Sequence, residues 1–164
     1  MIRVITFYRP CLGDTQDVEA SYTTLAQHKR YFDDYNINSR TQFITDIGEL
    51  IQDFLNKIEK LIVMGDYNDD VRTNHHFKEL GLIEAVTTKF LYLPPTYNRS
   101  KQFSRPINGL WMSPEIIIKK CGYSAFEEGS PSDHRLVWAD IDFSTTFGCP
   151  WNKLPRTTPR RLKC

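Results

Sequence analysis

The sequence predicts an α/β protein in which a strand–helix–helix–strand segment is followed by short antiparallel strands. Two observations carry this prediction. The first 64 residues alternate β-branched runs with helical periodicity, and after residue 80 short apolar runs are separated by turn residues without a long helical stretch. A length of 164 residues and a hydrophobic fraction of 40% fit one folded domain.

The first half of the chain contains four expected elements. β-branched and aromatic residues predict a strand over residues 2–7, and helical spacing predicts a first helix over residues 18–32. The second helix is the clearest element, because apolar residues recur at intervals of three and four over residues 43–58 and form one wide stripe. A short buried strand follows at residues 61–64. This order predicts a crossover connection onto one sheet.

The strands expected after residue 80 are short and are separated by turn-rich stretches. They span residues 82–87, 107–112, 116–121 and 135–141.

The charge of the chain is nearly balanced but unevenly distributed. With 21 basic and 20 acidic residues the net charge is +1, which excludes a globally basic nucleic-acid coat protein. Residues 150–164 hold five basic residues, no acidic residue and three prolines, which prevent a regular helix. We therefore expect one domain over residues 1–149 and a basic tail over 150–164. The tail is either a solvated end or an arm that contacts phosphates through Arg156, Arg160 and Arg161.

The cysteines and the hydropathy predict an intracellular protein, in the cytoplasm or nucleus, without a membrane partner. The four cysteines lack zinc-ligand spacing, and no apolar run is long enough for a signal peptide or a membrane span. The adjacent His75 and His76 cannot easily aim both rings at one metal, so we expect them at the surface.

Polar side chains that suit phosphate chemistry gather where the expected strands end. Asp66 and Asn68 follow a buried strand, and Asp133 and His134 precede the last strand. A carboxylate and an amide two residues apart can hold a water or a metal, and a protonated imidazole stabilises developing negative charge. Each motif alone is also ordinary turn chemistry, and Tyr97 alone fits a core aromatic. Together they suit phosphodiester hydrolysis with Mg²⁺.

Five short motifs occur in the order that is typical of one superfamily. They are Phe7-Tyr8-Arg9-Pro10, Gly65-Asp66-Tyr67-Asn68, Pro95-Thr96-Tyr97, Ile107-Asn108-Gly109-Leu110-Trp111 and Ser132-Asp133-His134. On these motifs the chain resembles the endonuclease/exonuclease/phosphatase superfamily, which includes abasic-site endonucleases and pancreatic deoxyribonuclease. Residues 129–138 are most similar to nuclease domains linked to reverse transcriptases in retroelements. The resemblance implies the later part of a two-sheet β-sandwich flanked by helices, truncated before its first strands.

The resemblance also implies a role for each matching residue. Tyr8 would contact the scissile phosphate, and Asp66 would position or deprotonate the attacking water. Asn68 would bind the phosphate and its developing charge, and His134 would bind a phosphate oxygen. Asp133 would help to hold Mg²⁺, for which Mn²⁺ is an alternative.

Two departures from the family's pattern predict an impaired enzyme. The chain begins after the family's first strand and its metal-binding Glu motif. Asn108 stands where the family has an Asp that keeps the catalytic histidine protonated. A neutral amide can still accept a hydrogen bond from His134, so we expect the two side chains within hydrogen-bond reach, but the amide cannot stabilise the imidazolium by charge. Tyr97 matches a structural tyrosine near the site.

We also expect an uncovered apolar sheet face, which leads to self-association or to pairing with a separately encoded N-terminal half.

The expected function is Mg²⁺-dependent hydrolysis of DNA phosphodiesters by descent, impaired in this chain. One alternative is a phosphomonoesterase that acts on a small phosphate ester, since the fold does not choose between the two activities. A second is a non-catalytic module that binds nucleic acid or protein, and a third is a decayed reading frame without a selected function. The basic tail favours nucleic acid, so DNA is the expected partner.

Overall fold

The computed structural model describes residues 1–10, 37–98, 105–128, 132–148 and 150. The helix predicted over residues 18–32 and the basic residues of the tail lie outside these ranges.

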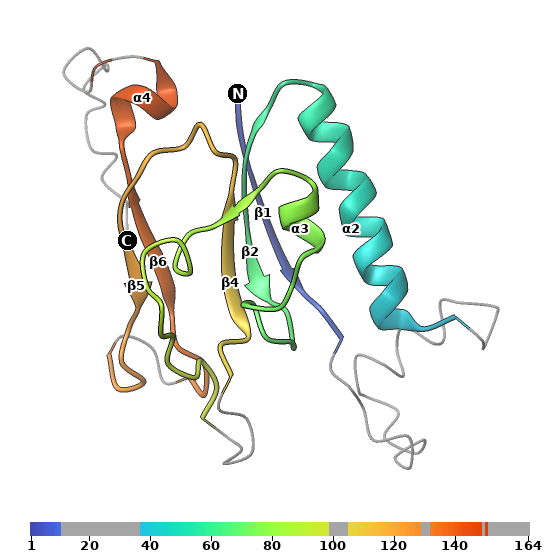
Figure 1. The fold of residues 1–164 in the computed structure, drawn as a ribbon, viewed down its shortest axis with the longest axis vertical. Helices are drawn as coiled ribbons and strands as arrows, with labels where there is room; N and C mark the ends of the chain where they lie inside the picture. The colour runs from blue at the N-terminus through green and yellow to red at the C-terminus, as the bar shows by residue number, and fades with distance from the viewer. Residues whose placement is uncertain (11–36, 99–104, 129–131, 149, 151–164) are drawn as a thin grey trace, which may run out of the picture.

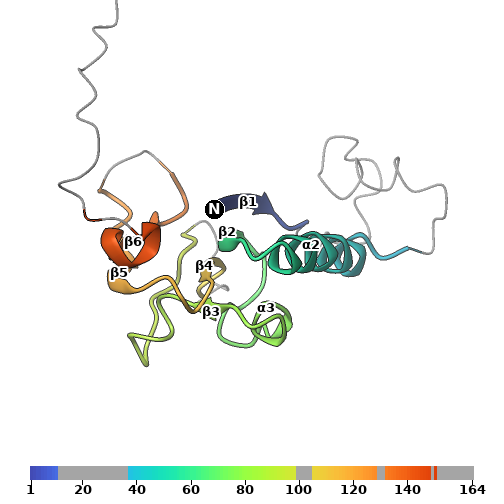
Figure 2. The ribbon, with the colours of Figure 1, turned by 90° about the horizontal axis from the view of Figure 1, so that it is seen from above.

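The described residues form two β-sheets and three helices in three layers. Their order along the chain is β1 (Ile2–Tyr8), α2 (Ser39–Asn56), β2 (Lys60–Asp66), α3 (His76–Glu79), β3 (Ile83–Glu84), β4 (Asn108–Met112), β5 (Ile118–Tyr123), β6 (Val137–Ile141) and α4 (Phe143–Phe147) (Figure 1). One sheet has the order β1-β2-β4-β3, and β5 pairs with β6 in a second sheet. Figure 2 shows α2 and α3 on one side of the four-stranded sheet and β5–β6 on the other. The predicted α/β class with two sheets is confirmed.

The strand register brings three of the predicted site residues to one edge of the sheet. β1 and β2 pair in parallel, which confirms the predicted crossover, and β4 joins β2 antiparallel. Tyr8 pairs with Asp66, and Asp66 pairs with Asn108. Side chains from three adjacent strands therefore start from the same end of the sheet.

Helix α2 covers the outer face of this sheet with the apolar stripe that its sequence predicts. Ile47 and Ile51 are buried in one cluster with Leu61 and Val63 of β2. The helix begins earlier than predicted, because the Asn38 side chain accepts hydrogen bonds from the backbone N–H groups of the first turn.

The end of α2 differs from the prediction. The helix stops at Asn56, and Ile58, which we predicted to continue the apolar stripe, has a φ of 58° and is 90% exposed. This prediction was wrong because the chain must reverse direction there to enter β2. Leu50 is also exposed, at 42%, although it belongs to the predicted stripe.

The later elements agree with the prediction in order but not in every boundary. β4, β5 and β6 lie within two residues of their predicted positions. β3 is only two residues long, because the Glu84 carboxylate accepts the Thr87 N–H at 2.6 Å and starts a turn. The short helices α3 and α4 were not predicted. His75 and His76 are exposed, as predicted. Within the described ranges, no helix is long and apolar enough to cross a membrane.

We predict that Gly65→Ala strongly destabilises the fold, because a Cβ at this position would lie 2.1 Å from the Phe7 carbonyl oxygen. The expected loss is about 3 kcal/mol, since the pairing of β1 with β2 must shift. Gly48 in α2 is the matched control, because a Cβ there meets nothing within 4 Å. Gly48→Ala should stabilise the helix by about 0.5–1 kcal/mol. Urea unfolding measures both, and a Gly65→Ala protein as stable as the wild type would contradict this packing.

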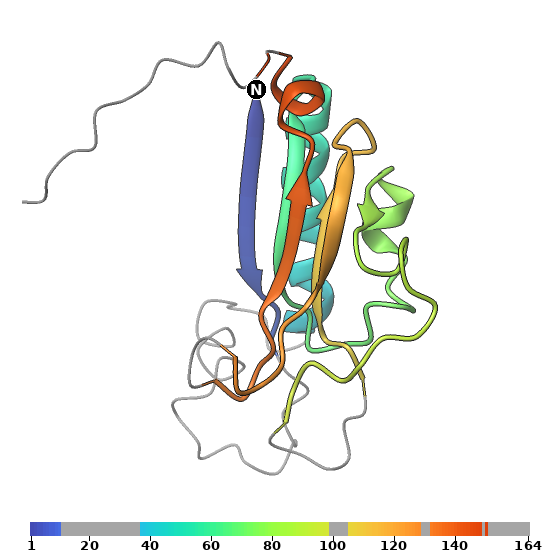
Figure 3. The same cartoon turned by 90° about the vertical axis from the view of Figure 1, so that its left-hand side faces the viewer.

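The exposed face of β1 is consistent with self-association of the chain, which stays a prediction. β1 is an edge strand, and in Figure 3 it lies beyond the edge of the β5–β6 sheet. Val4 is 57% exposed on this face. We expect the chain to self-associate at tens of micromolar and Val4→Lys to weaken that association, because a charge on an edge strand opposes pairing. Sedimentation velocity measures this, and a wild-type monomer would contradict it.

Candidate active site

The turn after β2 holds a buried carboxylate at the edge of the sheet. Asp66 is 9% exposed, and its Oδ1 accepts the backbone N–H of Asn68 at 2.8 Å. Asn68 has a φ of 46°, and its side-chain Nδ2 donates to the Arg9 carbonyl at 2.6 Å. Asparagine tolerates this left-handed conformation better than most residues. The turn therefore fixes both side chains relative to the end of β1.

His134 faces Asp66 and Asn108 from a different part of the chain. An isolated bridge pairs His134 with Tyr97, and their rings lie 4.8 Å apart between centroids. The Nδ1 atom of His134 is 3.0 Å from Oδ1 of Asn108, and Nε2 is 3.8 Å from Oδ2 of Asp66. Because an amide oxygen only accepts, Nδ1 donates in this arrangement. The hydrogen bond predicted between Asn108 and His134 is confirmed.

The environment of Asp66 makes its carboxylate more basic than an exposed one. Burial raises the pKa of Asp66, and the negative charge of Asp133 adds to this rise. The Asn68 N–H and the positive charges of His134 and Arg40 act in the opposite direction without cancelling it. A carboxylate with a raised pKa is a better proton acceptor. Asp66 therefore suits the removal of a proton from water.

Two residues that the sequence analysis did not assign hold Asn108 in place. Thr96 is fully buried, and its Oγ1 accepts the backbone N–H groups of Ile107 at 2.8 Å and Asn108 at 3.1 Å. The Tyr123 hydroxyl donates to the Asn108 carbonyl at 2.9 Å. Burial raises the pKa of Tyr123 well above its usual value, so the hydroxyl keeps its proton. Of these two residues, only Thr96 belongs to a motif that the sequence analysis identified, Pro95-Thr96-Tyr97.

Two buried arginines support the turn that carries Asp66. Arg9 and Arg40 are each 8% exposed. The Arg40 guanidinium donates to the carbonyls of Pro10, at 2.5 Å, and Asn68, at 3.1 Å, while Arg9 donates to the Asp69 carboxylate at 3.1 Å. These contacts tie the first turn of α2 to the ends of β1 and β2. Sequence reasoning missed them because an arginine near a helix start is usually exposed.

We predict that Arg40→Met destabilises the fold by about 3 kcal/mol, because it leaves two carbonyls without their donor. It should also raise the pKa of Asp66 further, since the positive charge of Arg40 lowers it. Arg40→Lys keeps the charge and loses the forked geometry, so it should destabilise the fold but leave the Asp66 pKa closer to that of the wild type. Urea unfolding and carboxyl NMR titration measure the two effects. Equal stability of Arg40→Met and wild type would contradict this role.

The structure places most predicted site residues together. Tyr8 is 48% exposed and pairs with Asp66 across β1 and β2. Asp133 precedes His134 in the chain, and the Asp133 backbone carbonyl accepts the Asn98 N–H at 2.9 Å. The predicted residues that meet at this edge are Tyr8, Asp66, Asn68, Tyr97, Asn108, Asp133 and His134. Arg156, Arg160 and Arg161 of the tail lie outside the described residues. The catalytic roles of all these residues stay predictions.

The donor set fits a magnesium ion only in part. Among the described residues, no group of three or more His, Cys, Asp or Glu side chains is arranged to hold a metal. Mg²⁺ often takes one or two carboxylates and completes its shell with water and substrate phosphate. Asp133 offers one such carboxylate. The residues therefore fit an ion that is shared with a bound phosphate rather than one held in a cage of protein ligands.

Comparison with known proteins identifies the fold. The sequence matches no family model and no curated protein. Among solved structures, a 3′-5′ exonuclease from Neisseria meningitidis matches with 18% identity and a TM-score of 0.60, over 87% of this chain and 62% of that chain. A 3′ phosphatase from Neisseria, bound to product DNA hairpin, matches with 17% identity and a TM-score of 0.59 over the same shares.

The fold is thus an α/β sandwich that this chain shares with a 3′-5′ exonuclease and a 3′ phosphatase, in agreement with the fold that the sequence predicts. An endonuclease/exonuclease/phosphatase family protein from Leptotrichia buccalis is also similar, with 22% identity and a TM-score of 0.47 over 60% of this chain and 43% of that chain. This chain spans 62% of the length of each of the two Neisseria structures.

Proposed function

We propose that this chain hydrolyses phosphate esters at the site formed by Asp66, Asn108 and His134. One observation carries the proposal: the His134 ring lies between the Asn108 amide oxygen, at 3.0 Å, and the Asp66 carboxylate, at 3.8 Å. The Asp66 carboxylate, which can accept a proton, therefore faces the His134 ring, which can become a cation, at the edge of the sheet. The fold, shared with an exonuclease and a 3′ phosphatase, supports this reaction class.

The roles follow from the donors and acceptors that the fold leaves unused. The Asp66 carboxylate, with its raised pKa, takes a proton from water as the water oxygen attacks phosphorus. The bond between phosphorus and the ester oxygen breaks, and the departing oxygen takes a proton from solvent water. One hydrogen of the Asn68 amide is engaged with the Arg9 carbonyl, which leaves the second for a phosphate oxygen. A Mg²⁺ ion held by Asp133 and the substrate would neutralise phosphate charge.

The protonation of His134 limits the rate in this proposal. Because Nδ1 donates to Asn108, Nε2 carries a hydrogen only when the ring is an imidazolium. Only that form donates to a phosphate oxygen, and a neutral amide does not stabilise it by charge. Activity should therefore be slow.

We propose DNA as the substrate. Five basic residues without an acidic one in residues 150–164 supply positive charge for a polyanion. The 3′ phosphatase of the same fold is bound to a DNA hairpin. A small phosphate monoester remains the alternative, because the same groups would bind either phosphate.

A substrate panel with Mg²⁺ tests this function. The panel holds supercoiled plasmid, abasic duplex, a 3′-phosphorylated DNA hairpin and inositol phosphates. We expect slow turnover of a DNA substrate that disappears in Asp66→Asn and persists in Asp140→Asn, which removes the same charge from an exposed position on β6. Hydrolysis that survives Asp66→Asn would overturn the proposal. Salt-dependent DNA binding without cleavage would instead support a non-catalytic module.

A further inference from the structure

We propose that a second pocket, on the outer face of the four-stranded sheet, binds a small organic anion with a flat apolar body. The pocket has a volume of about 430 Å³, which falls in the range of small-molecule sites. It lies between α3 and the segment at residues 87–93, and none of its lining residues belongs to the candidate active site. The inference is therefore independent of the proposed hydrolysis.

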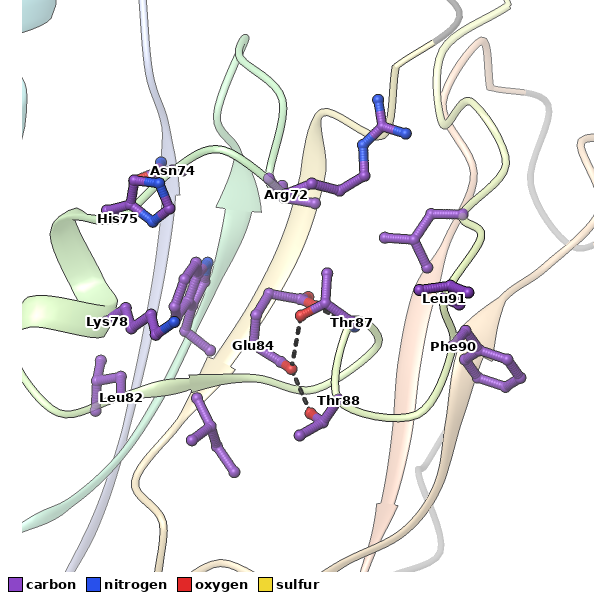
Figure 4. Close-up of a pocket in the computed structure, with 14 residues that line it drawn as sticks. Arg72, Asn74, His75, Lys78, Leu82, Glu84, Thr87, Thr88, Phe90 and Leu91 are labelled. Atoms are coloured by element: carbon purple, nitrogen blue, oxygen red, sulfur yellow. Dashed lines mark hydrogen bonds between the residues drawn. The ribbon is translucent and has the colours of Figure 1, made fainter.

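The walls of the pocket are apolar and its rim is basic. Trp111 and Leu82 line it from the core, where each is at most 3% exposed. In Figure 4, His75 and Lys78 lie on one side and Phe90 and Leu91 on the other. An apolar body with a negative group matches this combination of surfaces.

The charges around the pocket leave one cation available. Lys78 makes no ion pair with another described residue, whereas Arg72 pairs with Asp70 at 2.5 Å. Among the described lining residues the carboxylate is that of Glu84, and its oxygens accept the backbone N–H groups of Thr87 at 2.6 Å and Leu110 at 3.1 Å. The backbone therefore satisfies this acidic group, and none of the residues that the structure describes serves as a counterion to Lys78.

A buried donor without an acceptor gives the second indication of a ligand. Asn74 lines the pocket and is 7% exposed. Its Oδ1 accepts the His76 N–H at 3.2 Å, but its Nδ2 has no partner among the described residues. A buried amide donor without an acceptor is unfavourable. Because protein atoms cover this Nδ2, a turn of the Asn74 side chain toward the pocket would let it donate to an oxygen of a bound anion.

Two exposed apolar side chains at the edge of the pocket, Leu91 and Phe90, form a lip and are the reason for proposing an apolar ligand body. Leu91 is 84% exposed and Phe90 is 48% exposed, although both are large apolar side chains. Neighbouring exposed apolar residues often mark a binding surface. The flat body of a ligand packed against this lip would remove part of that surface from water.

Phenylphosphonate is the probe, because it combines a ring with a dianionic group and has no ester bond to hydrolyse. In ¹H–¹⁵N NMR of the whole chain we expect saturable shifts of the Trp111 indole N–H and the Asn74 amide, with a Kd of about 1 mM or tighter. Trp138→Phe and Trp151→Phe assign the indole signal. Inorganic phosphate or benzyl alcohol alone should bind at least about tenfold more weakly, since each supplies one half of the recognition.

Two variants make the test specific. Lys78→Glu should weaken the binding at least about fivefold, whereas Lys57→Glu, at the C-terminal end of α2 and outside the pocket lining, should leave it unchanged. Leu91→Asn keeps the charge of the protein and should also weaken the binding of phenylphosphonate, because an apolar contact is lost. Shifts that do not saturate, or equal affinity of Lys78→Glu and wild type, would overturn the proposal whether or not the chain hydrolyses phosphate esters.

Discussion

Asp66→Asn is expected to reduce phosphate ester hydrolysis by at least about a thousandfold while it stabilises the fold at neutral pH. The loss follows because an amide cannot take the proton of the attacking water. The gain in stability follows because Asp66 is a carboxylate at 9% exposure whose pKa burial raises. Ionising it in the folded state is unfavourable relative to the unfolded chain.

The pH dependence of this effect has a definite sign. Below the ordinary carboxyl pKa, Asp66 is protonated in both the folded and the unfolded state, so wild type and Asp66→Asn should be equally stable. As the pH rises through the raised pKa of folded Asp66, the wild type loses stability relative to the variant, by about 1.4 kcal/mol for each unit of elevation. Urea unfolding at about pH 3 and about pH 7 measures the difference. A variant that is less stable than wild type at neutral pH would contradict the cause we assign.

Asn108→Asp is expected to raise the rate of hydrolysis. The Asn108 oxygen already lies 3.0 Å from Nδ1, so a carboxylate there would stabilise the imidazolium without a change of geometry. Because the imidazolium is the form that donates to a phosphate oxygen, the rate at mildly basic pH should rise about 10–1000-fold.

The rates of hydrolysis by wild type and variant at mildly basic pH measure the effect. Asn56→Asp, at the end of α2, adds the same charge away from the site and is the matched control. An unchanged rate in Asn108→Asp would contradict this role of the Asn108–His134 pair.

The sequence could predict those parts of the fold and the site that depend on local patterns. The apolar run before Asp66 and the spacing of Ile47 and Ile51 specify a buried strand and one helix face, and both are confirmed. The contact between Asn108 and His134 was predicted only through the order of the motifs, because the two residues lie 26 positions apart.

The features that the sequence did not reveal depend on tertiary contacts. Arg40 has the local sequence of an exposed helix residue, yet its acceptors lie on segments that only the folded chain brings near. Thr96 is similar, since its hydroxyl binds backbone groups of β4 and of the residue before it. Ile58 continues the spacing of apolar residues seen along α2, but the chain turns at this position to enter β2, which leaves the Ile58 side chain exposed.

The pH–rate profile of single-turnover hydrolysis tests the central claim most directly. The measurement compares wild type and Asn108→Asp on a 3′-phosphorylated DNA hairpin with Mg²⁺ and excess protein. The account predicts a slow wild-type rate that falls at basic pH, and a faster variant whose rate falls only at higher pH. Profiles that superimpose, or hydrolysis that survives His134→Gln, would contradict it.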